Sequence, residues 1–223
     1  MNTKERLYDR IQMLPSQSIP EDIASGIIHG IGILISIAAL VILVVFASLK
    51  GNVAQVIAFS IFGGFAVLYY LCSTFHHSLT HYKAKRVFRI MEQSAVYLFF
   101  AGTIFPLHFV IMNSTWSWIF FLITAILCII GILNLFLNKK NSNDIKFIIN
   151  ILLVNFLVIG ILVSLKYFTP DFKTFFVPGC ILYLIGFWFA TMNGMKYNQS
   201  ITHSFSLIAT ILHFFAFLEL ISF

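Results

Sequence analysis

The residues best suited to chemistry are histidines that follow a serine or a glutamine by one helical turn. Ser73 and His77 are four residues apart, as are Gln199 and His203, so each pair shares one face of a helix. Neutral imidazoles from separate helices are good Zn²⁺ ligands, and a carboxylate and a water complete a four-coordinate shell. An open water position would make such a site catalytic. A serine one turn from a ligand histidine can orient the imidazole or stabilise an oxyanion.

Two further segments add polar residues to this set. Glu21, Ser25 and His29 follow each other at intervals of four residues and share one helix face. Glu92 is an acidic residue inside an otherwise apolar segment. Ionisable groups in such segments are costly without a partner, so both segments are candidates for the same site.

The elements that must position these residues are membrane-spanning helices. The chain has 223 residues, of which 60% are hydrophobic and 10% charged. Apolar runs of about 20 residues recur, each long enough to cross a hydrocarbon core of roughly 30 Å. We expect an all-α, polytopic protein of the cell membrane, with a polar arm at 1–20 and a seven-helix transmembrane domain at 21–223. The seven predicted spans are about 23–48, 53–77, 89–111, 115–137, 146–167, 173–192 and 200–222.

The basic residues predict the orientation of this bundle. Seven spans divide the loops into two sets, and eleven of the fourteen Lys and Arg residues fall in one set. The positive-inside rule makes that set cytoplasmic, which places the N-terminus inside and the C-terminus outside. The net charge of +6 then indicates anionic lipid headgroups as partners, and no nucleic acid. The eleven residues are Lys4, Arg6, Arg10, Lys83, Lys85, Arg86, Arg89, Lys139, Lys140, Lys146 and Lys196.

This orientation brings polar residues of four spans to one depth. The second span ends at the cytoplasmic side and carries His77 near that end. The first, third and seventh spans begin there, with His29, Glu92 and His203 within about two turns of the start. Topology alone therefore predicts a polar cluster in the cytoplasmic leaflet, and the chemistry of its members suits a metal.

Simpler roles are open for several of these residues. His81 lies beside the basic segment YKAKR and fits a solvated loop, and His76, turned about 100° from His77, fits the headgroup interface. Glu92 fits a structural ion pair with Arg89 or with a histidine. The three cysteines lack C-x-x-C spacing and are interpreted as small buried hydrophobic residues: Cys72, Cys128 and Cys180.

Four segments together resemble a known family. They are EDIASGIIHGIG from Glu21, STFHHSL from Ser73, RVFRIMEQSAVYLFFAGTIFP from Arg86 and HSFSLIATILHFFAF from His203. In this order they resemble the hemolysin III family of bacteria, part of the progestin and adipoQ receptor superfamily, which is thought to be related to alkaline ceramidases. The resemblance covers nearly the whole chain.

The resemblance implies seven helices, a cytoplasmic N-terminus and a zinc near the cytoplasmic face. Its implied ligands are His77 and two histidines at the start of the last helix, of which His203 is the second. An acidic residue at the start of the third helix, here Glu92, would hold a zinc-bound water. His29 and Glu21 match the histidine and the leading glutamate of the first-helix motif.

The chain departs from the family pattern at several of these positions. Gln199 stands where the pattern has the first histidine of the last helix, Glu92 replaces an aspartate, and Ser25 replaces an asparagine. Either the metal is weakened or lost, or the site is rebuilt. In a rebuilt site Glu92, one methylene longer than Asp, reaches the metal and forms a zinc shell with His77 and His203.

These features favour two functions and leave open whether the protein is an enzyme. The first is a metal-dependent hydrolase of a lipid amide or ester, with Glu92 as base and Ser73 assisting the oxyanion; its partner would be a lipid substrate. The second is a non-enzymatic, receptor-like or regulatory protein that affects membrane lipid state or energetics. A cytolysin, suggested by the family name, is third, because a seven-span protein is built to stay in its own membrane.

Overall fold

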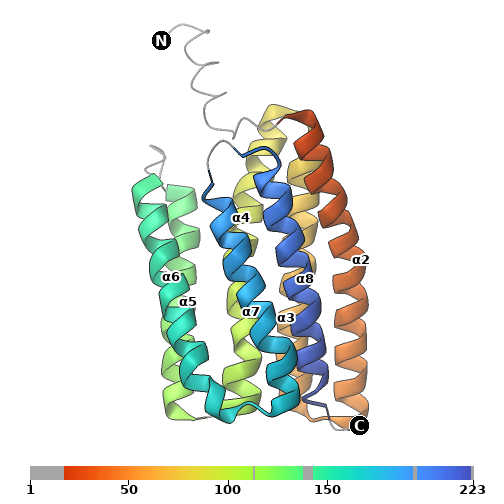
Figure 1. Cartoon of the computed structure of the whole chain (residues 1–223), viewed down its shortest axis with the longest axis vertical. Coiled ribbons are helices and arrows are strands. Elements are labelled where there is room, and N and C mark those ends of the chain that lie inside the picture. The colour runs from red at the N-terminus through yellow and green to blue at the C-terminus, as the bar shows by residue number, and fades with distance from the viewer. Residues whose placement is uncertain (1–17, 113, 138–142, 193–194, 222–223) are drawn as a thin grey trace, which may run out of the picture.

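The computed structural model describes residues 18–112, 114–137, 143–192 and 195–221. Most of the predicted arm at 1–20 and the basic pair Lys139 and Lys140 lie outside the described residues. Within them the chain is all-α (Figure 1). Its helices are α2 (Ile19–Lys50), α3 (Val53–Ser78), α4 (Tyr82–Pro106), α5 (Thr115–Leu137), α6 (Asn143–Ser164), α7 (Pro170–Ala190) and α8 (Asn198–Leu218), with a π-helix η1 (Leu107–Met112) and a 3₁₀ turn η2 (Leu165–Tyr167).

Six helical segments of the described chain are long and apolar enough to cross a membrane. Large apolar side chains also point outward along them, as on α2, where Ile27 and Leu34 are 59% and 72% exposed. An apolar surface of this extent fits lipid, so the fold indicates a multi-pass membrane protein. The six are Ile19–Lys50, Val53–Ser78, Lys83–Met112, Thr115–Leu137, Pro170–Ala190 and Asn198–Leu218, and Leu152–Tyr167 is a shorter apolar stretch.

The third predicted span begins earlier than expected. The prediction started it at residue 89, whereas α4 is helical from Tyr82. Lysine and arginine are good helix formers, so the basic segment extends the helix by two turns beyond its apolar part. This extension places Lys85 on α4, where it contacts residues of α2 and α3.

Capping residues fix the start of the first two helices. The Glu21 carboxylate accepts hydrogen bonds from the Ser18 backbone N–H and hydroxyl, at 2.8 and 2.7 Å. Asn52 and Gln55 form a reciprocal box, in which each side-chain oxygen accepts from the other residue's backbone N–H. Side chains at these positions satisfy helix N–H groups that have no partner within the helix. The box of Asn52 and Gln55 starts α3 directly after the end of α2 at Lys50.

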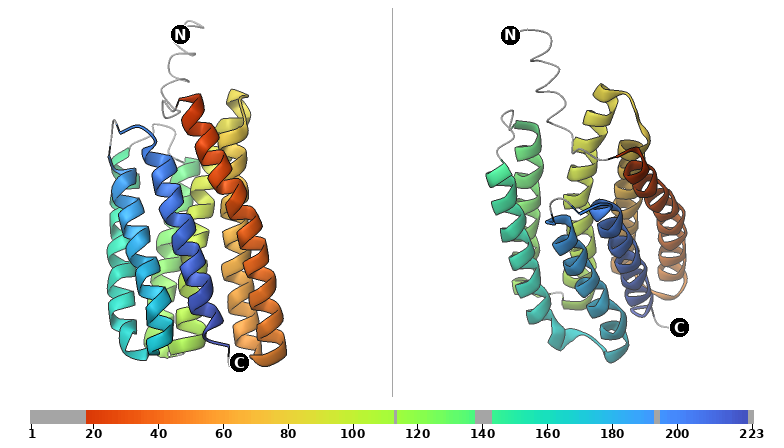
Figure 2. Two further views of the ribbon diagram at one scale, coloured as in Figure 1. Left: turned by 45° about the vertical axis from the view of Figure 1, so that its right-hand side comes forward. Right: turned by 45° about the horizontal axis from the view of Figure 1, so that its top comes forward.

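The helices run roughly parallel to one long axis, with α5 and α6 at one side of the bundle and α2 at the other (Figures 1 and 2). The helix α2 packs against α3 and α8, and α3 also packs against α4. The starts of α2, α4 and α8 and the end of α3 meet at one end of the molecule. This end of the bundle carries the predicted site residues.

Aromatic residues fill the centre of the bundle. Tyr70, Phe59, Phe62, Phe172, Phe176 and Phe217 are each less than 2% exposed. Their rings stack or meet edge to face, for example Phe62 and Phe217 with centroids 4.8 Å apart. This packing joins α3, α7 and α8, and the ring of Tyr70 also lies beside that of His29.

Candidate metal centre

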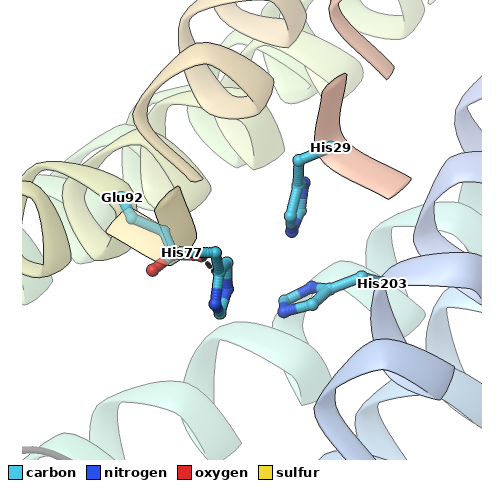
Figure 3. Close-up of side chains that lie close together, drawn as sticks. All are labelled: His29, His77, Glu92 and His203. Atoms are coloured by element: carbon cyan, nitrogen blue, oxygen red, sulfur yellow. Dashed lines mark ion pairs between the residues drawn. The ribbon is translucent and has the colours of Figure 1, made fainter. Parts of the chain in front are cut away.

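Three histidines and one glutamate converge at the end of the bundle where α2 begins. They are His29 of α2, His77 of α3, Glu92 of α4 and His203 of α8. One candidate ligand atom from each lies within 4.8 Å of the others. The side chains come from separate helices and point toward one another (Figure 3). The structure therefore brings together the four residues that the depth argument placed at one level.

The ring geometry places the three imidazoles around a common centre. The centroid of His29 is 4.2 Å from that of His203 and 5.7 Å from that of His77, and the rings of His77 and His203 are 5.4 Å apart. The Glu92 carboxylate approaches from α4, with Oε1 at 3.7 Å from Nε2 of His77.

Several nitrogens of these rings are buried without a hydrogen-bond partner among the described residues. They are Nδ1 and Nε2 of His29, Nε2 of His77 and Nε2 of His203. A buried polar atom without a partner costs about 1–3 kcal/mol, and these nitrogens belong to the three rings that surround the candidate centre. A metal ion would satisfy one nitrogen of each ring, so the donor set fits a bound metal.

The spacing is close to that of a metal-ligand shell. In a tetrahedral shell with bonds of about 2.1 Å, the ligand atoms lie about 3.4 Å apart. The four candidate atoms lie within 4.8 Å of one another, so the widest separation would close by at most about 1.4 Å on binding. Three imidazoles with one carboxylate are a ligand set that Zn²⁺ accepts.

Ser73 lies beside this cluster and contacts Glu92. Its Oγ donates to Oε1 of Glu92 at 2.9 Å, and Ser73 is fully buried. The hydroxyl hydrogen is therefore committed to the carboxylate in this structure. The contact orients Glu92, while assistance to an oxyanion by Ser73 stays a prediction.

His76 does not face the headgroup interface that was expected for it, but is buried between α3 and α4. The residue is 3% exposed, its Nδ1 is 3.1 Å from the backbone oxygen of Lys85, and its Nε2 is 3.7 Å from Oε2 of Glu92. The expectation was wrong because α4 begins early and covers the face of α3 that carries His76. His81, in contrast, is exposed at the start of α4, as predicted.

The remaining predicted polar residues hold α2 to α8 close to the centre. The hydroxyl oxygens of Ser25 and Ser200 are 2.9 Å apart and buried. Glu21 accepts from the backbone N–H of Tyr197 at 2.7 Å, so it caps α2 and fixes the segment before α8. Gln199 is half-buried, one turn before His203.

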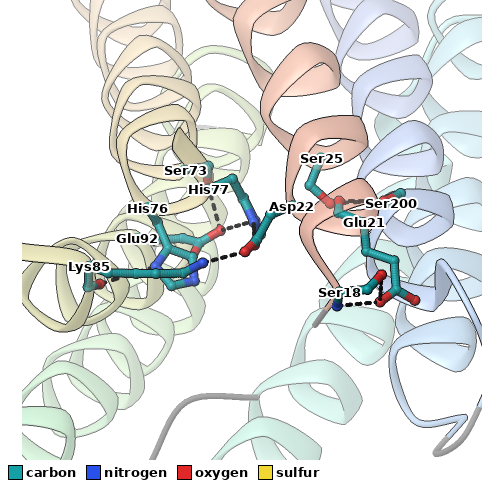
Figure 4. Close-up of polar contacts among 10 residues, drawn as sticks. All are labelled: Ser18, Glu21, Asp22, Ser25, Ser73, His76, His77, Lys85, Glu92 and Ser200. Atoms are coloured by element: carbon teal, nitrogen blue, oxygen red, sulfur yellow. Dashed lines mark hydrogen bonds and ion pairs between the residues drawn. The ribbon is translucent and has the colours of Figure 1, made fainter. Parts of the chain in front are cut away.

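An acidic residue beside the cluster was not among the predicted ones. Asp22 of α2 has its Oδ1 3.1 Å from Nδ1 of His77 and forms an ion pair through Oδ2 with Lys85 (Figure 4). Its spacing could have placed it, since Asp22, Ser25 and His29 lie at i, i+3 and i+7 and share one helix face. The contact of Asp22 with His77 on α3 is seen only in the structure.

The comparisons with known proteins agree with the family resemblance. The model of the Haemolysin-III related family matches residues 17–214. The chain is 32% identical to Hemolysin-3 of Bacillus cereus over 203 residues, covering 91% of this chain and 93% of that protein. It is 34% identical to the Hemolysin-3 homolog of Bacillus subtilis (strain 168) over 209 residues, covering 90% and 94%. The chain thus belongs to the Haemolysin-III related family of multi-pass membrane proteins.

Proposed function

We propose that this protein is a zinc-dependent hydrolase of an amide or ester bond in a membrane lipid. The observation that carries the proposal is the convergence of three imidazoles, with buried and unpartnered nitrogens, on one carboxylate. In the proposed site His29, His77 and His203 hold the zinc through one nitrogen each, and Glu92 lies against them.

Zinc, when bound, supplies a Lewis acid that polarises a carbonyl oxygen and activates water. Glu92 is the residue of this chain suited to move the proton, because a carboxylate beside the reacting atoms can act as general base. Ser73 donates to Oε1 of Glu92 at 2.9 Å, a contact that orients the carboxylate for this role. The Glu92 side chain is 11% exposed, so this carboxylate has little contact with bulk water.

The position of the cluster supports a lipid as the substrate class. All four residues lie on helices long and apolar enough to span the membrane. A molecule that reaches them from the bilayer must itself be lipid-soluble along most of its length, and it needs one polar bond at the depth of the cluster. Lipids with an amide or ester near the headgroup meet both conditions.

The test measures metal content and hydrolysis in the same preparation. Wild-type protein purified in detergent is expected to contain one zinc per chain and to hydrolyse a lipid amide or ester. His29→Ala and His203→Ala are each expected to lose the zinc and the hydrolysis. The matched control is His81→Ala, which removes an exposed histidine at the same end of the bundle, and it should keep both.

Zinc-free wild-type protein, or variants that hydrolyse as fast as wild type, would refute the proposal. Glu92→Gln separates the two parts of the site. It keeps the size of the side chain and removes the base, so we expect retained zinc with hydrolysis reduced at least about 100-fold.

A second candidate function is a non-enzymatic regulatory protein in which the same cluster clamps four helices. The observation that favours it is the burial of the centre, with His29 fully buried and Ser25 paired to Ser200 beside it. In that case His203→Ala lowers the unfolding temperature in detergent, while no lipid hydrolysis is detected in wild-type protein under any metal loading.

A further inference from the structure

The two ring nitrogens of His77 lie in different surroundings. Nε2 faces the cluster and has no hydrogen-bond partner among the described residues, whereas Nδ1 is 3.1 Å from Oδ1 of Asp22. The side chain of His77 is 1% exposed and that of Asp22 is 16% exposed. A carboxylate only accepts hydrogen bonds, so the proton of a neutral His77 ring belongs on Nδ1. The lone pair of Nε2 then points at the centre of the cluster.

Asp22 is itself held from a third helix. Its Oδ2 pairs with Nζ of Lys85, which lies on the part of α4 that extends beyond the apolar segment. The backbone oxygen of Lys85 is 3.1 Å from Nδ1 of His76. Lys85 therefore contacts both α2 and α3, and each carboxylate oxygen of Asp22 has a defined partner (Figure 4).

We infer that Asp22 is a positioning residue, which fixes the ring and the tautomer of His77 so that Nε2 is presented to the metal, and that Lys85 holds Asp22 in place. The inference rests on the proposed metal site and adds to it a residue from outside the ligand set. A carboxylate behind a ligand histidine makes the imidazole a stronger donor and limits its rotation, and removing such a partner typically costs 10–100-fold in metal affinity.

A purely structural role for the same contacts makes a different prediction. If Asp22 only ties α2 to α4 through Lys85, its loss lowers the stability of the fold without changing the state of the His77 ring. Metal affinity and the tautomer of His77 therefore separate the two roles, and thermal stability alone does not.

The first measurement is zinc affinity, by competition with a chelator in detergent. Asp22→Ala is expected to bind zinc 10–100-fold more weakly than wild type. Asp22→Asn keeps an acceptor oxygen, so its loss of zinc affinity should be smaller than that of Asp22→Ala. Lys85→Met keeps the backbone contact to His76, and its loss of zinc affinity should also be smaller. The matched control is Asp171→Asn, an exposed aspartate in the first turn of α7, which should bind like wild type.

The second measurement needs no metal. Nitrogen-15 spectra of metal-free protein are expected to show His77 protonated on Nδ1 in wild type and a mixture of tautomers in Asp22→Ala. If wild type binds zinc and Asp22→Ala binds it equally tightly, the inference is wrong while the proposed site stands. If wild type binds no zinc, the proposed function fails. The spectra then decide the positioning role, and mixed tautomers in wild type overturn it.

Discussion

At the scale of single residues, the third imidazole of the cluster comes from α2. The family pattern implies a histidine at position 199, and the chain has Gln199 there, one turn before His203. His29 is fully buried, with its ring centroid 4.2 Å from that of His203. Three imidazoles are thus present although one expected histidine is missing. The rebuilt site expected from the sequence used Glu92 with His77 and His203, whereas the structure also offers His29 as a third imidazole. We therefore take a rebuilt site to be one in which His29 is a ligand.

Gln199→His tests the choice between a lost and a rebuilt site directly. Because His29 already completes the set, we expect wild type and the variant to contain the same amount of zinc, one ion per chain, when both are measured by elemental analysis after the same purification. Zinc in Gln199→His together with none in wild type would contradict the rebuilt site and show that the native centre is degraded.

The sequence predicts some of these residues and not others, for a physical reason. Helical spacing groups Ser73 with His77, and span orientation adds Glu92 and His203 at the same depth. The spacing of residues along one helix shows which of them share a face, but not which neighbouring helix packs against that face. The burial of His76 and the contact of Asp22 with His77 both depend on such neighbours, so they appear only in the structure. The burial of His29 could be predicted from the sequence, since His29 lies on the face of α2 that also carries Ser25.

At the scale of helices, a close contact between α2 and α3 supports the centre. Gly32 lies against the ring of Tyr70, where an added Cβ would be 2.3 Å from Cδ1. The Tyr70 hydroxyl oxygen is 2.7 Å from Oγ1 of Thr210 on α8, and its ring centroid is 5.8 Å from that of His29. The missing side chain at position 32 therefore sets the distance between α2 and α3 beside the candidate metal ligands.

A pair of glycine variants tests this contact. Gly32→Ala forces Tyr70 or α2 to move, and we expect a destabilisation of about 1–3 kcal/mol together with weaker zinc binding. Gly30→Ala is the matched control, because an added Cβ there meets nothing within 4 Å. Thermal unfolding in detergent should show no loss of stability in Gly30→Ala. Equal unfolding temperatures for the two variants would argue against a supporting role of the contact.

At the scale of the whole molecule, the orientation in the membrane stays a prediction of the positive-inside rule. In the membrane of intact cells, a cysteine at position 83 should be protected from an impermeant maleimide and a cysteine at position 50 should react. Both residues are exposed in the structure, so after lysis both should react. Wild-type protein is the control, because it shows how much maleimide reacts with the native cysteines Cys72, Cys128 and Cys180. Labelling of Lys83→Cys in intact cells would show that the orientation is the opposite of the predicted one. The candidate metal centre would then lie at the outer face.

The proposed metal centre also predicts how stability is distributed over the bundle. Its three ligands come from α2, α3 and α8 and its base Glu92 from α4, and none of these four residues lies on α5 or α6. A ligand that binds only the folded state stabilises it by roughly 2.7 kcal/mol at 100 times its Kd. Chelation is therefore expected to lower the unfolding temperature of wild type and of His81→Ala, and to leave that of His77→Ala unchanged.

The loss on chelation should also be local, because the proposed site lies at only one end of the bundle. Hydrogen exchange in detergent is expected to speed up at the start of α2, α4 and α8 and at the end of α3, with α5 unaffected. A uniform change along all helices would mean that the metal acts through the fold as a whole. Unchanged exchange in wild type would mean that the four residues do not hold a metal. A local response instead indicates that the metal stabilises the helix ends that position His29, His77, Glu92 and His203.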